Sequence, residues 1–156
     1  MSFQNKEALS NVNEALQNLP SSHLYTKEQL ELVYSIAYGY ATQNHFEEAL
    51  PFFAFLTQYA PTTKHFLTGL GLCLQRLERY ADAIQVYSFI GTIYPDSPES
   101  SVQVAECLIS QNRHEEALEV LNIVNRFYSH QKQKNAIQVR AKALTELLNS
   151  KFVSNN

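Results

Sequence analysis

The chain has 156 residues, of which 45% are hydrophobic and 17% charged, a balance typical of one globular domain spanning residues 1–156. Its formal net charge is −3 without any cluster of lysine or arginine, whereas a nucleic-acid-binding protein needs a positive stripe to meet phosphates. Residues 1–25 hold no apolar run behind a basic start, and no stretch approaches the roughly 20 apolar residues that span a bilayer. We therefore expect a cytosolic protein that binds no nucleic acid and does not insert directly into a membrane.

The first expected element is a helix over residues 5–19. Its apolar residues are spaced as on one helical face, which Pro20 ends: Leu9, Val12, Leu16 and Leu19. This face needs a partner surface. It either caps the array described next or forms a dimer interface with a second copy of the chain, and the sequence alone does not choose.

Residues 30–131 contain three copies of one pattern. Ala49, Ala83 and Ala117 are 34 residues apart, and each lies in a similar short phrase. The copies cover residues 30–63, 64–97 and 98–131. At the eighth position, where two helices approach closely, the residues are small: Ala37, Gly71 and Ala105. At the seventh position they are large, namely Ile36, Leu70 and Val104, and so are those at the eleventh, namely Tyr40, Leu74 and Leu108. Each copy therefore predicts a hairpin of two packed helices.

Several residues mark the helix boundaries. Thr26 and Gln29 form a capping-box pattern, and Asp96 or Ser97 is expected to cap the first helix of the third copy. Pro51 lies inside a predicted helix, where we expect a kink rather than a break.

Two further features complete the pattern. Cys73 and Cys107 occupy the same repeat position, which favours two buried free thiols over a disulfide bridge. A closing helix is expected over residues 136–150, where Ile137, Ala141, Leu144 and Leu148 share one face.

A 34-residue helical hairpin unit resembles the tetratricopeptide repeat. The resemblance covers residues 30–128 and implies an all-α fold: a tetratricopeptide-repeat superhelix of three helical hairpins, flanked by an N-terminal helix and a C-terminal capping helix. The third copy departs from the family pattern, because Ser101 replaces a large residue and Ser129 replaces proline.

The sequence offers no catalytic constellation. No histidine lies at metalloprotease spacing from a glutamate and a second histidine, no Cys-x-x-Cys occurs, and no serine lies in a nucleophile-elbow motif. We expect neither an enzyme nor a bound cofactor or metal.

The concave face of the superhelix is the candidate site. Positions 2, 5, 9 and 12 of each first helix are expected to line it: Glu31, Tyr34, Tyr38 and Ala41; His65, Thr68, Leu72 and Gln75; Glu99, Val102, Glu106 and Ile109. These residues make a partly apolar track where charged side chains are usual, and such a surface favours a ligand. The alternative is that one of the chain's own terminal helices fills the groove.

Residues 32–38, 66–71, 105–108 and 140–144 resemble the class II chaperones of bacterial type III secretion, and the similarity extends over about residues 24–149. The resemblance implies a homodimer in the bacterial cytoplasm that holds an extended segment of hydrophobic translocator proteins in its groove before export. The family's aromatic groove positions match at Tyr34, Tyr38 and Phe46, whereas another falls on Ala41. The alternatives are a generic tetratricopeptide scaffold or needle-subunit co-chaperone that joins two folded partners, and a regulatory subunit of an enzyme or an unrecognised enzyme.

Overall fold

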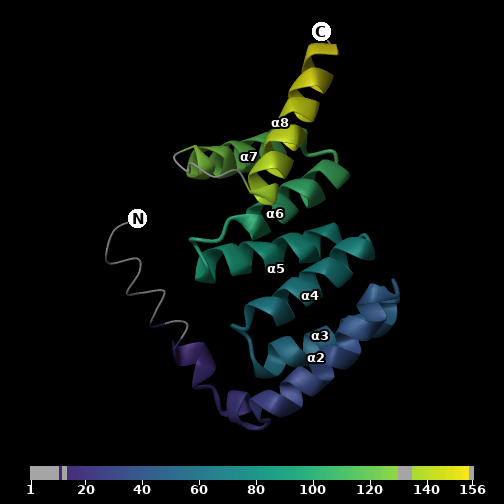
Figure 1. The fold of residues 1–156 in the computed structure, drawn as a ribbon, viewed down its shortest axis with the longest axis vertical. Helices are drawn as coiled ribbons and strands as arrows, with labels where there is room; N and C mark the ends of the chain where they lie inside the picture. Colours follow the sequence, from purple (N-terminus) through teal and green to yellow (C-terminus); the bar gives the residue numbers. More distant parts are fainter. Residues whose placement is uncertain (1–10, 12–13, 130–134, 155–156) are drawn as a thin grey trace.

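The computed structural model describes residues 11, 14–129 and 135–154, and Figure 1 shows them as a stack of helices that ends in α8. Within these ranges the chain is helical and contains no strand, which confirms the all-α fold. The elements in chain order are η1 (Pro20–His23), α2 (Lys27–Thr42), α3 (Phe46–Tyr59), α4 (Lys64–Arg76), α5 (Tyr80–Ile93), α6 (Glu99–Ser110), α7 (His114–Tyr128) and α8 (Ala136–Ser154). No helix in this part of the chain combines the length and the apolar character needed to cross a membrane.

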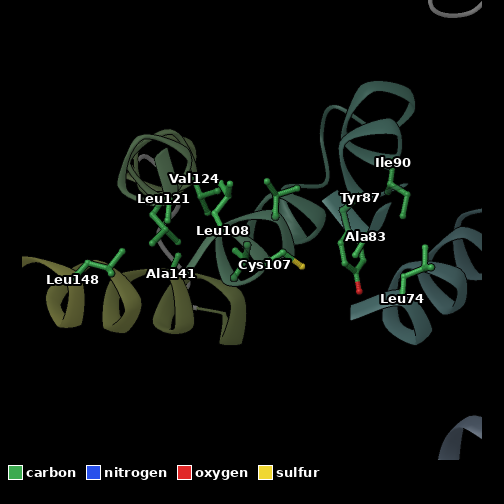
Figure 2. Close-up of a cluster of buried hydrophobic side chains, with 14 of the residues drawn as sticks. Leu74, Ala83, Tyr87, Ile90, Cys107, Leu108, Leu121, Val124, Ala141 and Leu148 are labelled. Atoms are coloured by element: carbon green, nitrogen blue, oxygen red, sulfur yellow. The ribbon is translucent and has the colours of Figure 1, made fainter. Parts of the chain in front are cut away.

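Successive helices pack on one another along the whole array, and α2 also touches α4 while α6 touches α8. The buried side chains form two clusters. The smaller one joins α2, α3 and α4 around Leu30, Phe53 and Phe66. The larger one runs from α4 to α8, and Figure 2 shows Leu74 of α4 and Leu148 of α8 near its two ends. Each repeat thus buries its apolar face against its neighbours, as expected of a solenoid.

Small residues allow the helices to approach closely. Ala37 and Ala105 are 0% exposed, and a Cβ on Gly71 would lie 2.7 Å from the ring of Tyr87. The expected close packing at the eighth repeat position is confirmed. An even tighter contact occurs at Gly69, where a Cβ would lie 2.0 Å from the ring of Phe53.

The helix boundaries agree with the sequence at one site and differ at another. The capping box at Thr26 is present, since its backbone amide donates to Gln29 Oε1 (2.8 Å) and its hydroxyl accepts from the Gln29 amide (3.2 Å). In contrast, neither Asp96 nor Ser97 caps α6, which begins at Glu99 behind Pro98. The Ser97 hydroxyl instead donates to the Glu99 carboxylate and accepts from Lys64, so it links two repeats and is not available to the backbone amides.

The first hairpin differs from the expectation on its outer side. Ile36 is 45% exposed and Tyr40 37%, although both were expected to be packed. Their equivalents in later repeats face the second helix of the preceding repeat. The described residues before α2 contain no such helix, only η1, which packs against α3, and a short helical segment over residues 14–17. Tyr40 stacks on Phe52 of α3 at a ring distance of 5.8 Å. Helix α3 is continuous through Pro51, which confirms that this proline does not break it.

The two cysteines are buried free thiols, as the sequence predicted. Burial raises the pKa of Cys73 and of Cys107 to about 11, so both are neutral packing groups near neutral pH. Tyr87 belongs to α5, which packs against both α4 and α6, the helices that carry these thiols, and its hydroxyl donates a hydrogen bond to Gln75 Oε1 at 3.1 Å.

Helix α6 is enclosed by three helices, namely α5, α7 and α8. Val102 is therefore 1% exposed and belongs to the larger core cluster. The expectation that Val102 lines an open groove is wrong. Ile109 also packs against this cluster. Glu106 keeps only 13% of its side chain exposed, and its Oε1 forms an ion pair with Arg140 Nε of α8 at 2.5 Å. The closing helix thus covers the third repeat on the side where the groove was expected to continue.

Substitution of Gly69 by alanine should destabilise the protein by about 2 kcal/mol, because the added methyl group overlaps the Phe53 ring. Gly39 is the matched control: it also lies inside a helix, but nothing is within 4 Å of its Cβ position. Gly39→Ala should therefore stabilise the fold by roughly 0.5–1 kcal/mol through helix propensity. Urea unfolding followed by circular dichroism measures both. Equal stability of the two variants would contradict the close contact.

Val102 and Thr68 occupy the same repeat position but opposite environments, buried and exposed respectively. Val102→Thr should lower the free energy of unfolding by about 1.5 kcal/mol, because it places a hydroxyl in the apolar core. The converse change Thr68→Val should alter stability by less than about 0.5 kcal/mol. The same urea experiment checks both variants, and a tolerated Val102→Thr would show that α8 leaves this position open.

Candidate functional site

A pocket of about 740 Å³ lies between the first helices of repeats one and two. We call it the aromatic pocket. Its walls come from α2, the turn after it, α3 and α4. The lining residues are Tyr34, Tyr38, Ala41, Thr42, Asn44, Phe46, Phe53, Lys64, His65, Thr68, Gly69, Leu72 and Arg76. This surface is a mainly apolar hollow with a polar rim, which is the usual form of a ligand site.

Tyr34 lines the pocket and packs against three other rings. Its ring lies 4.7 Å from the His65 ring, 5.6 Å from Phe66 and 6.0 Å from Phe53. Burial is the main cause that raises the pKa of its hydroxyl, with smaller contributions from Tyr38 and Glu31. The phenol is therefore neutral at physiological pH and offers a rigid apolar wall with one polar tip.

Tyr38 is the accessible aromatic residue of the pocket. It is 56% exposed, and its ring lies 5.9 Å from that of Tyr34. Thr68 across the pocket is exposed, and Leu72 is half-buried. The exposed ring has apolar area left to bury, so a ligand here gains contact area at little cost in conformational entropy.

Charged side chains stand on the rim of the pocket. His65 Nε2 lies 3.1 Å from Glu31 Oε1, an ion pair when the imidazole is protonated. Lys64 Nζ lies 3.6 Å from Glu99 Oε2 of the next repeat. The guanidinium carbon of Arg76 lies 5.6 Å from the centre of the Phe46 ring, a cation–π contact. The rim is thus polar while the floor is apolar.

The structure brings most predicted residues of repeats one and two together and separates those of repeat three. Seven of them line the aromatic pocket: Tyr34, Tyr38, Ala41, Phe46, His65, Thr68 and Leu72. Gln75 does not line it and accepts the hydrogen bond from Tyr87. Val102, Glu106 and Ile109 lie away from it, in the part that α8 covers.

Sequence reasoning missed Phe53 and Arg76. Phe53 lies in the second helix of its hairpin, and its ring reaches the pocket because Gly69 has no side chain. A signal was present, since the other two repeats carry Ser35 and Gln103 where the second has Gly69. Arg76 carries no repeat signal that distinguishes it from any other exposed arginine.

A second pocket of about 460 Å³ adjoins the first at Lys64 and His65. We call it the Lys27 pocket. It is lined by Gln17, Tyr25, Lys27, Leu30, Glu31, Tyr59, Ala60, Pro61, Thr62, Thr63, Lys64, His65, Phe66 and Tyr94. Tyr25 packs edge-on against Tyr59 at 4.8 Å, and the Tyr94 hydroxyl donates to the Thr62 carbonyl. The pocket is thereby fixed by contacts from both neighbouring repeats.

The residues expected at a dimer interface are only partly within the described chain. Leu9 and Val12 lie outside the described residues. Leu16 is half-buried in a short helical segment over residues 14–17, and Leu19 is 41% exposed in the bend that follows.

Known structures resemble this fold closely. The SycD chaperone of Yersinia enterocolitica in complex with a peptide of the translocator YopD is 25% identical, with TM-score 0.73, covering 81% of this chain and 96% of that one. PcrH from Pseudomonas aeruginosa is 22% identical, with TM-score 0.73 and coverages of 80% and 95%. A type III secretion complex from Aeromonas hydrophila is 21% identical, with TM-score 0.78 and coverages of 93% and 97%.

A comparison with curated proteins finds no match. A family model described as anaphase-promoting complex, cyclosome, subunit 3 matches residues 42–124, which is more than half of the chain. The match falls on the helical repeats from the end of α2 to the middle of α7. The chain therefore belongs to this family of tetratricopeptide-like repeat proteins, and it has the fold of the type III secretion translocator chaperones.

Proposed function

We propose that the protein is a chaperone of type III secretion that holds an extended segment of a hydrophobic translocator protein before export. The observation that carries this proposal is the aromatic pocket, whose floor is apolar and whose accessible ring is Tyr38. Two similar structures support it: SycD is in complex with a peptide of the translocator YopD, and PcrH is in complex with the chaperone-binding region of PopD.

The size and apolar character of the pocket suit the task of covering part of an unfolded apolar segment. A protein destined for a membrane exposes long apolar segments, which aggregate at cellular concentrations unless they are covered. A pocket of about 740 Å³ covers a few side chains of such a segment, so the client is held at one point and stays unfolded elsewhere. The work belongs to the bacterial cytoplasm, where translocators are made. It requires no nucleotide, because the export machinery can drive release.

One observation favours a second candidate, a scaffold or needle-subunit co-chaperone that joins folded partners. Three large apolar side chains on the last two helices are at least half exposed: Ile123 at 59%, Val139 at 56% and Leu147 at 50%. Folded partners would bind such an outer surface and leave the aromatic pocket empty. Purification of co-expressed proteins that contain a stably folded partner and no hydrophobic translocator would favour this function.

Tyr38→Ala should weaken binding of a co-expressed hydrophobic translocator about tenfold, and Tyr34→Ala with Tyr38→Ala should abolish it, because the client loses the aromatic wall. The matched control is Tyr40→Ala, which changes the same residue type on the same helix outside the pocket. Pull-down and isothermal titration measure binding, while circular dichroism checks that helical content is kept. Unchanged binding in the double variant would contradict the proposed function.

We further propose a homodimer that uses the N-terminal segment. Leu9→Asp with Leu16→Asp should shift the solution mass from dimer to monomer, because two carboxylates would enter an apolar interface. Leu147→Asp, an exposed leucine of α8, is the control and should leave the mass unchanged. Light scattering of the full chain decides the question. A dimer that survives the double change would mean that the N-terminal segment only caps the array.

A further inference from the structure

The Lys27 pocket lies beside the aromatic pocket and has a different chemical character. The two share Lys64 and His65, so a chain that leaves one pocket along α2 and α4 enters the other. The walls of the Lys27 pocket combine aromatic rings with charged and hydroxyl side chains. Its ligand is therefore an apolar chain that also carries a polar or charged group.

Among the described residues, one cation that lines this pocket has no ion-pair partner. Glu31 is paired with His65 at 3.1 Å, and Lys64 with Glu99 at 3.6 Å. Lys27 is exposed and makes no ion pair or hydrogen bond with any described residue. The carboxylate next to it, Glu28, is hydrogen-bonded at the start of α2, which lowers its pKa, and Lys27 contributes least to that shift.

Lys27 is the cation through which this pocket attracts an anion on an acidic protein. Two lysines and one glutamate line the pocket, and Glu99, the ion-pair partner of Lys64, adds a second carboxylate, so these groups sum to zero with His65 neutral, whereas the whole chain carries −3. A carboxylate on the ligand therefore meets net repulsion from the chain as a whole but attraction to Lys27, which has no ion-pair partner among the described residues. Charge complementarity therefore selects an acidic side chain as the occupant.

Helix geometry gives the spacing between the two contacts. Lys27 precedes Tyr34 by seven residues and Tyr38 by eleven on the same helix. These separations correspond to roughly 10 and 16 Å along the axis, and an extended chain advances about 3.3–3.6 Å per residue. An extended ligand thus spans from Lys27 to the two tyrosines in about three to five residues.

We propose that the Lys27 pocket is a second subsite of the client groove and takes an aspartate or glutamate of the client. That acidic residue lies three to five positions from the apolar residue that contacts Tyr34 or Tyr38. The inference rests on the proposed function, since it assumes that the groove holds an extended peptide segment. Lys27 then determines specificity, because it selects among apolar segments those that carry a nearby carboxylate.

Selection of a displayed library of random twelve-residue peptides on the full-length protein tests this inference. Peptides enriched on the wild type should combine an apolar residue with Asp or Glu at the stated spacing. On Lys27→Glu the acidic preference should disappear, and a synthetic copy of the best acidic peptide should bind about tenfold more weakly. Lys142→Glu, an exposed change of equal charge on α8, should leave both results unchanged.

The outcomes separate the two proposals. Enrichment of apolar peptides without an acidic preference, or with the same preference on Lys27→Glu, overturns the second subsite and leaves the proposed function standing. Enrichment of no peptide, or enrichment that persists after Tyr34→Ala with Tyr38→Ala, overturns both. Loss of folding does not confuse the result, because glutamate is favourable in the first turn of a helix and circular dichroism verifies the variant.

Discussion

The contact between the Phe53 ring and the bare backbone of Gly69 determines the shape of the groove. Any side chain at Gly69 would overlap that ring, so α3 and α4 approach closely only because none is present. Phe53 can then extend from the hairpin interior to the floor of the aromatic pocket, where it supports Tyr34. The aromatic floor of the site and the close approach of α3 to α4 thus both depend on the missing side chain at Gly69.

The helices and the groove residues of the first two repeats could be predicted because they depend on local periodicity. A 34-residue repeat predicts which face of each helix is packed against its neighbours. Tyr34, Tyr38 and His65 could be predicted as groove residues because they lie on the concave side of their helices, away from that packed face. Val102 could not be placed in the same way. It shares its repeat position with Thr68, and the difference between them arises from the packing of α8 on α6, which repeat periodicity does not encode.

The other residues whose positions could not be predicted from the sequence also depend on contacts between elements. Phe53 reaches the site through a gap on another helix, and the Lys27 pocket is formed by residues from the start of α2, the turn between α3 and α4, and Tyr94 at the end of α5. No sequence window contains these groups together. Ile36 shows the converse error, because its apolar character predicted burial while its position on the first helix of the stack leaves it exposed. Sequence patterns thus predict which side chains lie on each face of a helix, and the packing of neighbouring elements determines which of them are buried.

The division of the interior into two clusters has a consequence for the unloaded protein. Leu50 and Leu70 pack against both clusters, but the floor of the aromatic pocket belongs to the smaller one, at the end of the array. Terminal repeats have fewer neighbours and open locally at lower free energy than central ones. A ligand that binds only the closed form of the first repeat raises the free energy needed to open that repeat. The unbound protein is therefore expected to open at this end more readily than the bound form, which makes it the more susceptible of the two to proteolysis.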